Sequence, residues 1–385
     1  MAKSKTKKNA DGKAPSRFVP QVEFANFICK FGEEDLLDYA EEIVIPAFLD
    51  TSDSKENRGG TYFLMNVELR LLDDNDESSL AFVGRLVKNT QIQIAQRYDN
   101  KTQRLVMAEQ IVDNAPSSLF VLILFNHVLL YVRETLEAPG TEAFGNTMET
   151  FLRRKHSRYI SEQLRSADVG KRIDDLAQEF QKKDVRGPRT EARKEITQQV
   201  RSQHQKPRIE VVPLAGALAT QELFDQIKTV NEINVRFVTD NGNEIGKNAA
   251  KALEVYFGDK QDLGADSFSI NAHSDTGLNR DRALAVVDAS LTSNTAHVRF
   301  EAVKEDGEKI TGDDFRIRLK RPFNIVTQTV INLLTPFRHM YDEWKEVEKK
   351  GLVKSDVTVG DAPKVQEKLK VIRASQRPAP ETAKE

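Results

Sequence analysis

Alternating basic side chains are the residues of this chain best placed to do chemistry. In the segment 313–322, DDFRIRLKRP, cations alternate with Phe315, Ile317 and Leu319. Because successive side chains of a strand point to opposite faces, this pattern predicts a half-buried strand with a cationic outer face. Such a face suits phosphate groups, which bind Lys and Arg without sequence specificity. The cations in and next to this predicted face are Arg316, Arg318, Lys320 and Arg321.

Two further groups of cations accompany this strand. The segments INVRFV and AHVRFEAV, at 233–238 and 296–303, resemble each other and place Arg236 and Arg299 at matching positions. If these strands lie beside the segment 313–322 in one sheet, their Arg side chains share its cationic face. The segment 144–163 has the spacing of a basic amphipathic helix. Its cations are Arg153, Arg154, Lys155 and Arg158.

Signatures of cofactor and metal sites are incomplete. The segment 242–247, GNEIGK, has three residues between its glycines where a phosphate-binding loop needs four. The single Cys and the six scattered His residues do not have the spacing of a zinc site. We interpret His127 as a turn residue, and the nearby His273 and Asp275 as a hydrogen-bonded loop pair. We therefore predict no metal and no cofactor.

A magnesium-dependent nuclease is the leading enzymatic alternative. It would need clustered carboxylates with a Lys, and Glu301, Lys304 and Asp288 are the nearest group in the sequence. Residues three apart on a strand face opposite ways, so Glu301 and Lys304 do not form a compact motif. The sequence leaves open whether the protein has catalytic activity, and it favours a protein that is not an enzyme.

Composition predicts a globular chain of about two domains. It has 385 residues, 39% of them hydrophobic, and a net charge of −2. The charge is segregated, since residues 151–210 carry 16 basic and 9 acidic residues whereas acidic residues predominate in 15–150. The lone Cys29, the lack of a signal peptide and the lack of a long apolar run favour a cytoplasmic protein without a membrane segment.

The core is expected around the segment 117–134, SSLFVLILFNHVLLYVRE. Its two apolar runs predict a β-hairpin that turns at Asn126 and His127, and their lack of alternation predicts central strands covered on both faces. We expect a helix over 33–47 ending at Pro46, a loop over 51–60, and further strands over 61–72, 79–85, 90–98 and 104–112. Together they predict a mainly antiparallel β-meander domain over 17–140, after a disordered basic arm over 1–16.

The remaining chain is predicted in three parts. Residues 141–206 should form basic helices over 144–163 and 169–181 and a partly helical, mobile connector over 182–206. Residues 207–350 should form an α+β domain with two βαβ units, in the ferredoxin-like pattern, and a long C-terminal helix over 323–350. Their strands are expected at 209–212, 233–239, 267–272 and 296–303, and their helices at 220–227 and 280–291. Residues 351–385 should be a disordered tail.

These features predict first a cytosolic nucleic-acid-binding protein, for example one subunit of a microbial nucleic-acid-processing or defence assembly. The alternative is a protein–protein interaction scaffold without nucleic-acid contact, using other subunits or self-association. The distribution of cations separates the two hypotheses. Cations that converge on one surface favour DNA or RNA, whereas dispersed cations favour the scaffold.

Overall fold

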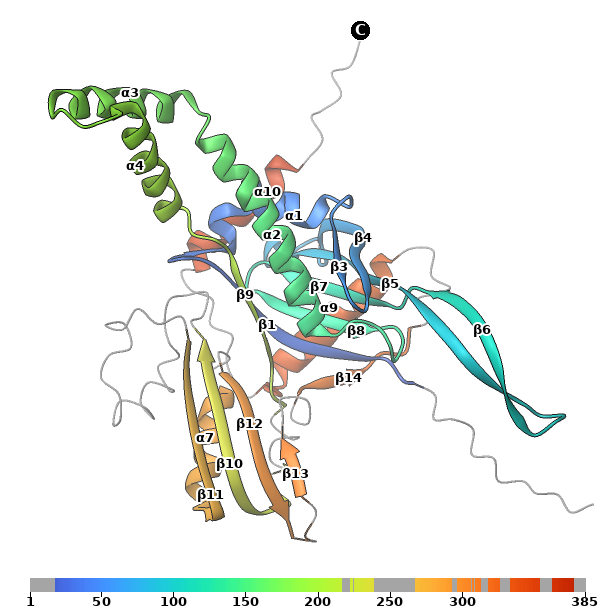
Figure 1. Ribbon diagram of the computed structural model, residues 1–385. Coiled ribbons are helices and arrows are strands. Elements are labelled where there is room, and N and C mark those ends of the chain that lie inside the picture. The colour runs from blue at the N-terminus through green and yellow to red at the C-terminus, as the bar shows by residue number, and fades with distance from the viewer. Residues whose placement is uncertain are drawn as a thin grey trace, which may run out of the picture.

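Two antiparallel sheets with flanking helices form an α+β fold (Figure 1). The computed structural model describes residues 18–216, 222–223, 225–238, 267–292, 296–305, 307, 309–312, 318–325, 333–353 and 362–376. The large sheet is strongly curled and has the order β14-β1-β8-β7-β5-β4-β3, with β2 and β9 also paired to β1 and β6 paired to β5. The small sheet has the order β11-β10-β12-β13.

The strands of the large sheet come from both halves of the chain. They are β1 (Gln21–Phe31), β2 (Glu34–Asp35), β3 (Ser54–Asn57), β4 (Gly60–Leu71), β5 (Leu80–Asp99), β6 (Arg104–Asn114), β7 (Ser117–Ile123), β8 (Val128–Arg133), β9 (Arg208–Pro213) and β14 (Lys320–Pro322).

The predicted central hairpin is confirmed as β7 and β8. These strands pair with each other, and β5 and β1 flank them, so the hairpin occupies the middle of the sheet. Its residues contribute to two separate cores, because alternate side chains point to opposite faces. The turn is longer than expected and spans 124–127, with His127 in the left-handed region at φ 56°.

Helices cover both faces of the large sheet. On one face, α1 (Ile45–Leu49), α2 (Thr141–Gln163) and α10 (Ala362–Ser375) contribute to a core that includes Phe48, Phe144 and Leu369. On the other face, α9 (Leu334–Lys349) buries Met340 and Trp344. The sheet is therefore sandwiched between elements that are distant in the sequence, as the blue to red colours of Figure 1 show.

The segment 33–49 differs from the single helix that we predicted. Asp35 caps a short 3₁₀ turn (Leu36–Tyr39), which continues as a π-helical turn (Ala40–Val44) and then as α1. Pro46 lies at the start of α1, where a missing N–H is tolerated, and so does not end the helix. The predicted loop 51–60 contains β3, and the two strands predicted at 79–98 are one continuous strand, β5.

The predicted connector 182–206 contains a helix. α3 (Ala167–Lys182) and α4 (Pro188–Gln203) form a helical hairpin that projects from the sheet (Figure 1). Val169, Ile196 and Val200 pack together in its small core, with Ile160 of α2. The spacing of Ala192, Ile196 and Val200 is typical of a helix, but the sequence does not show which segments this helix packs against.

The small sheet consists of β10 (Ile227–Val238), β11 (Ser267–Leu278), β12 (Ala296–Lys304) and β13 (Lys309–Gly312), with α7 (Arg280–Thr292) on one face. The strands and helix predicted over 267–303 are confirmed in kind, although β11 continues to Leu278. The strand expected at 209–212 pairs instead with β1 of the large sheet. The ferredoxin-like layout is therefore not confirmed.

The C-terminal segments also differ from the prediction. Residues 323–325 are not helical, and Pro336 lies in the first turn of α9 instead of its middle. The predicted disordered tail contains α10, which buries Leu369 and Ile372 against the large sheet. The arm predicted at 1–16 and the last part of the predicted tail, 377–385, lie outside the described residues, as does the segment 242–247. In the described part of the chain, no helix is long and apolar enough to cross a membrane.

Candidate functional site

The cations of α2 do not form one free surface. Arg153 contacts Glu149 at 2.7 Å, and Arg154 contacts Asp53 at 3.5 Å while donating to the backbone oxygen of Ser54. Both side chains are about half exposed, as is expected of surface ion pairs on a helix. Arg158 is exposed.

Lys155 is buried, with a side chain only 4% exposed. Its Nζ lies 2.5 Å from Asp50 and 2.8 Å from Asp53, so it connects α2 to the segment after α1. Burial alone would lower the pKa of Lys155, but the hydrogen bonds to the two carboxylates raise it above its ordinary value. Lys155 is thus a structural cation, and the prediction that it contacts nucleic acid has no support in this geometry.

The structure describes only the second half of the predicted cationic strand, from Arg318 to Pro322. Residues 313–317, including Arg316, lie outside the described residues. Arg318 and Lys320 both approach the buried Glu23 of β1, at 3.7 Å and 3.9 Å, and Arg133 approaches the same carboxylate at 3.7 Å. We expected an exposed outer face, but these side chains are only 24% and 19% exposed because they neutralise Glu23. Arg321 is half-buried in β14.

Arg236 and Arg299 lie on the outer face of the small sheet. They come from the paired strands β10 and β12, opposite the buried face that α7 covers. Arg299 is exposed, whereas Arg236 donates to Glu210 of β9 at 2.7 Å. They share no sheet with Lys320, since β14 pairs with β1, and Arg318 lies before β14 in an isolated bridge to Ala215. The single cationic face expected from the sequence is therefore divided between the two sheets.

A cavity of about 370 Å³ lies where the two sheets meet, and its lining includes Arg236, Arg318, Glu210 and His297. Burial alone would raise the pKa of Glu210, but hydrogen bonds from His297 and Arg236 lower it. The carboxylate at the centre thus balances the cations around it. This cavity has the properties of an ion-paired junction.

The residues considered for catalysis are also separated. Glu301 lies on the outer face of β12, whereas α7, which carries Asp288, covers the inner face. His273 and Asp275 form a 3.1 Å pair at the exposed surface of β11. Within the described ranges, no group of three or more His, Cys, Asp or Glu side chains could hold a metal ion.

An additional cationic stripe occurs on α4, which the sequence had placed in the connector. Arg193, Lys194 and Arg201 lie at helical spacing along one face of α4 and line a shallow hollow of about 560 Å³ with Thr190, Thr197 and Gln198. All three cations are exposed. The amphipathic pattern Ala192, Ile196 and Val200 could have revealed this helix from the sequence.

The most unusual surface is on a two-stranded ribbon formed by β5 and β6. Beyond Asn89, β5 pairs with β6 alone in the described residues, and the ribbon projects from the sheet (Figure 1). Six of its large apolar side chains are exposed, Met107 by 73% and Leu105 by 68%. The others are Ile92, Tyr98, Ile111 and Val112.

Strand register gathers most of these apolar side chains on one face. Ile92 pairs with Val112, Tyr98 with Leu105, and Gln96 with Met107. A β-bulge between Met107 and Gln110 absorbs one extra residue of β6, so that positions before and after it keep the same face. We call this face the ribbon face. Its members are Thr90, Ile92, Ile94, Gln96, Tyr98, Leu105, Met107, Gln110, Val112 and Asn114.

Among the side chains of the ribbon that the structure describes, none on the ribbon face is charged. The cations and carboxylates of the ribbon, such as Arg97, Arg104 and Asp113, occupy the opposite face because they pair with Val106, Asp99 and Gln91. The sequence already showed the alternation QIQIAQRY, which is typical of a half-buried strand. It could not show that no other described element covers the apolar side.

Comparison with known proteins gives no further guidance, since no family model and no curated protein matches the chain.

Proposed function

We propose that this protein is an assembly protein that self-associates through the ribbon face. The supporting observation is an uncharged, largely apolar face on a ribbon whose two strands project from the body of the protein. A two-stranded ribbon is only marginally stable in water, and additional strands or packing are needed to order it. Burial of its exposed Met, Leu, Tyr and Val side chains would provide that packing.

A second copy of the chain is the partner that this face suits best. Its polar members are hydroxyl and carboxamide side chains, and Gln96 and Gln110 lie near its middle. A carboxamide has both donors and an acceptor, so it complements itself across a two-fold axis, which a charged group does not. The ribbon is about 30 Å long, so each copy can bury several hundred Å², a size typical of a reversible dimer.

The distribution of the other charges supports this proposal over nucleic-acid binding. The cations predicted from the sequence are dispersed over α2, β14 and the small sheet, and several of them neutralise a nearby carboxylate. Phosphate binding draws on cations that converge on one surface. The small sheet, for which we had predicted a ferredoxin-like domain, is in this proposal a separate unit held near β9 by Glu210.

Sedimentation velocity over a range of protein concentrations tests this proposal. We expect the parent protein to shift from monomer to dimer as concentration rises. Met107→Glu places a carboxylate on the ribbon face and should keep the protein monomeric. Arg97→Glu changes charge on the opposite face and should dimerise as the parent does. A parent protein that is monomeric throughout, or equal behaviour of the two variants, would refute the proposal.

Nucleic-acid binding remains a second candidate, and the cationic stripe of α4 favours it. The three exposed cations there, with the exposed Arg158 of α2, could contact phosphates without sequence specificity. Mobility shift of labelled DNA and RNA at two salt concentrations tests this. The variant Arg193→Gln/Arg201→Gln should weaken binding equally for all sequences and reduce the salt dependence, whereas Arg97→Gln should not.

The same titrations, repeated with magnesium, test the nuclease alternative through cleavage of the labelled strand. No shift of either nucleic acid by the parent protein at low salt would reject the second candidate.

A further inference from the structure

Among the residues that the structure describes, no strand pairs with the outer edge of β4 along most of its length. On one side, β4 pairs with β5 from Thr61 to Leu71, with a bulge after Met65. On its other side, β3 pairs only with residues 60–63. Among the described strands, none pairs with this edge beyond Phe63. An open edge presents backbone N–H and C=O groups that can pair with another extended chain.

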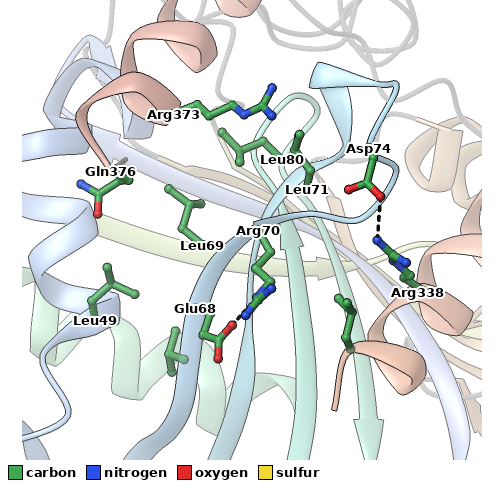
Figure 2. Close-up of a pocket in the computed structure, with 12 residues that line it drawn as sticks. Leu49, Glu68, Leu69, Arg70, Leu71, Asp74, Leu80, Arg338, Arg373 and Gln376 are labelled. Atoms are coloured by element: carbon green, nitrogen blue, oxygen red, sulfur yellow. Dashed lines mark hydrogen bonds and ion pairs between the residues drawn. The ribbon is translucent and has the colours of Figure 1, made fainter. Parts of the chain in front are cut away.

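This open edge lies in a groove between helices (Figure 2). A cavity of about 710 Å³ is lined by the five consecutive residues Val67–Leu71, and a second cavity of about 320 Å³ adjoins it along the same strand. Alternate residues of a strand point to opposite faces, so five consecutive residues can line one cavity only where it reaches the strand edge. Leu334 and Arg338 of α9, Arg373 of α10 and Gln376, which directly follows α10, also line it.

The two sides of the groove differ in chemistry. Val67, Leu69 and Leu71 point toward the core beneath α1 and α10, and with Leu49 and Leu80 they make this side apolar. Glu68 and Arg70 alternate with these residues and therefore point to the other side. There α9 contributes Arg338.

Guanidinium groups dominate the polar rim. Arg70 is paired with Glu68, Arg338 contacts Asp74 at 3.1 Å, and Arg373 is paired with Glu77. Arg70 and Arg338 are about half exposed, so their ion pairs are weak and exchange readily with another carboxylate. Because a guanidinium has five N–H donors, each Arg retains donors for a second anion.

We propose that this groove binds an extended peptide in which aliphatic and acidic residues alternate, added to the sheet as a strand beside β4. The peptide backbone would pair with the open edge of β4. Its aliphatic side chains would lie on the apolar side formed by Leu69, Leu71 and Leu80, and its acidic side chains would meet Arg70 and Arg338. Side chains of an added strand alternate between the two sides of the groove. The groove therefore favours a peptide in which every second residue is aliphatic and the residues between are acidic. This site is independent of the ribbon face.

A fluorescein-labelled peptide of alternating Glu and Val, EVEVEVE, is the probe, and fluorescence anisotropy with the full-length protein measures its affinity. Three control peptides separate the contributions. The first has Lys in place of Glu, the second contains the same residues with all Glu before all Val, and the third carries N-methyl groups on alternate amides. We expect each control to bind at least about fivefold more weakly, through lost charge pairing, lost alternation and lost backbone hydrogen bonds, respectively.

Two substitutions on the same strand face should act in opposite directions. Arg70→Gln removes a cation and should weaken binding of EVEVEVE by roughly threefold to fivefold. Glu68→Gln removes the carboxylate that competes for Arg70 and should strengthen binding by a similar factor. The matched control is Arg158→Gln, which removes an exposed cation of α2 that does not line the groove. It should not change the affinity for EVEVEVE. Both groove positions are half exposed, so the folded state should persist in each variant.

The proposal is overturned by any of three results: no binding of EVEVEVE by the parent, equal binding of the Lys peptide, or the same affinity in the Arg70 and Glu68 variants. Tighter binding of a peptide with the sequence of residues 377–385 would also overturn it, since the groove would then accept the chain's own terminus. Because the ribbon variant Met107→Glu should bind EVEVEVE as the parent does, failure here is distinguishable from failure of self-association.

Discussion

Lys155 is a cation that folding removes from solvent. It contacts Asp50 and Asp53, and its hydrogen bond is the largest influence that holds the pKa of Asp50 well below its usual range. Its neighbours Arg154 and Arg158 on the same helix remain at the surface. Residue type alone therefore did not separate a buried structural cation from exposed ones, because the difference depends on two carboxylates about one hundred positions earlier in the chain.

Lys155→Met should destabilise the protein by about 2–4 kcal/mol. The substitution leaves Asp53, only 16% exposed, with the half-exposed Arg154 at 3.5 Å as its remaining cation, and loss of the closer cation from a mostly buried carboxylate is costly. The partial exposure of Asp50 keeps the effect below that of a fully buried pair. Urea unfolding measures the change, with Arg158→Met as a control expected within about 0.5 kcal/mol. Equal stability of the two variants would contradict the structural role of Lys155.

His127 should make the stability depend on pH. Burial lowers its pKa to about 4, so the folded protein keeps the ring neutral while the unfolded chain protonates near its ordinary value of about 6.5. The free energy of unfolding should therefore fall by up to about 3 kcal/mol between pH 6.5 and 4, and this contribution should be constant below pH 4.

His127→Asn is the variant that isolates this pH effect. Asn adopts the left-handed φ of 56° at this position readily, and its backbone oxygen can still accept from the N–H of Phe27. Urea unfolding of parent and variant at several pH values compares the two slopes. A variant that loses stability between pH 6.5 and 4 as steeply as the parent would show that another group is responsible.

At the scale of elements, local pattern predicted the segments whose partners are adjacent in the sequence. β7 and β8 were identified from two continuous apolar runs, and α7 and β12 from helical and alternating periods. Bulges could not be predicted from the sequence, because a bulge depends on the residues of the neighbouring strand that lie opposite it. At such a bulge in β4, the two residues Asn66 and Val67 lie opposite the single residue Gly84 of β5.

Gly84→Ala should therefore destabilise the protein by about 1–3 kcal/mol. An added methyl group would meet a side-chain carbon of Val67 at 2.8 Å and the ring of Phe120 at 3.1 Å, so the strands must move apart. Gly170→Ala in α3 should act in the opposite direction, by about 0.5–1 kcal/mol, because nothing lies within 4 Å there and Ala favours the helix. Thermal unfolding of both variants tests this, and a neutral Gly84→Ala would contradict the close approach at the bulge.

At the scale of the molecule, the sequence did not reveal which strands complete the large sheet. Two strands pair with β1 one after the other: β9 pairs with residues 25–30 and β14 with residues 21–23. β9 and β14 contain ordinary strand residues, and nothing in them identifies a partner some two to three hundred positions earlier. The ion pairs of the candidate cations could not be predicted for the same reason, since Glu23 and Glu210, which neutralise them, also come from distant segments.

The two halves of the chain should consequently fold only together. A cut between Lys206 and Pro207 leaves residues 1–206 without β9 and β14, and without α9 and α10, which cover opposite faces of the large sheet. The exposed core and unpaired edge of this fragment should make it insoluble when it is expressed alone. Co-expressed with residues 207–385, it should copurify as a complex that unfolds in a cooperative transition.

Substitutions in the second fragment show whether this complex depends on β9. Val212 is 1% exposed and pairs with Asn26 of β1, so Val212→Asp places a charge in a buried strand and should abolish copurification. Lys228→Asp, at an exposed position of β10, reverses a charge without entering the large sheet and should leave the complex intact. Residues 1–206 that remain soluble and unfold cooperatively by themselves would instead support the separate domain over 207–350 that the sequence predicted.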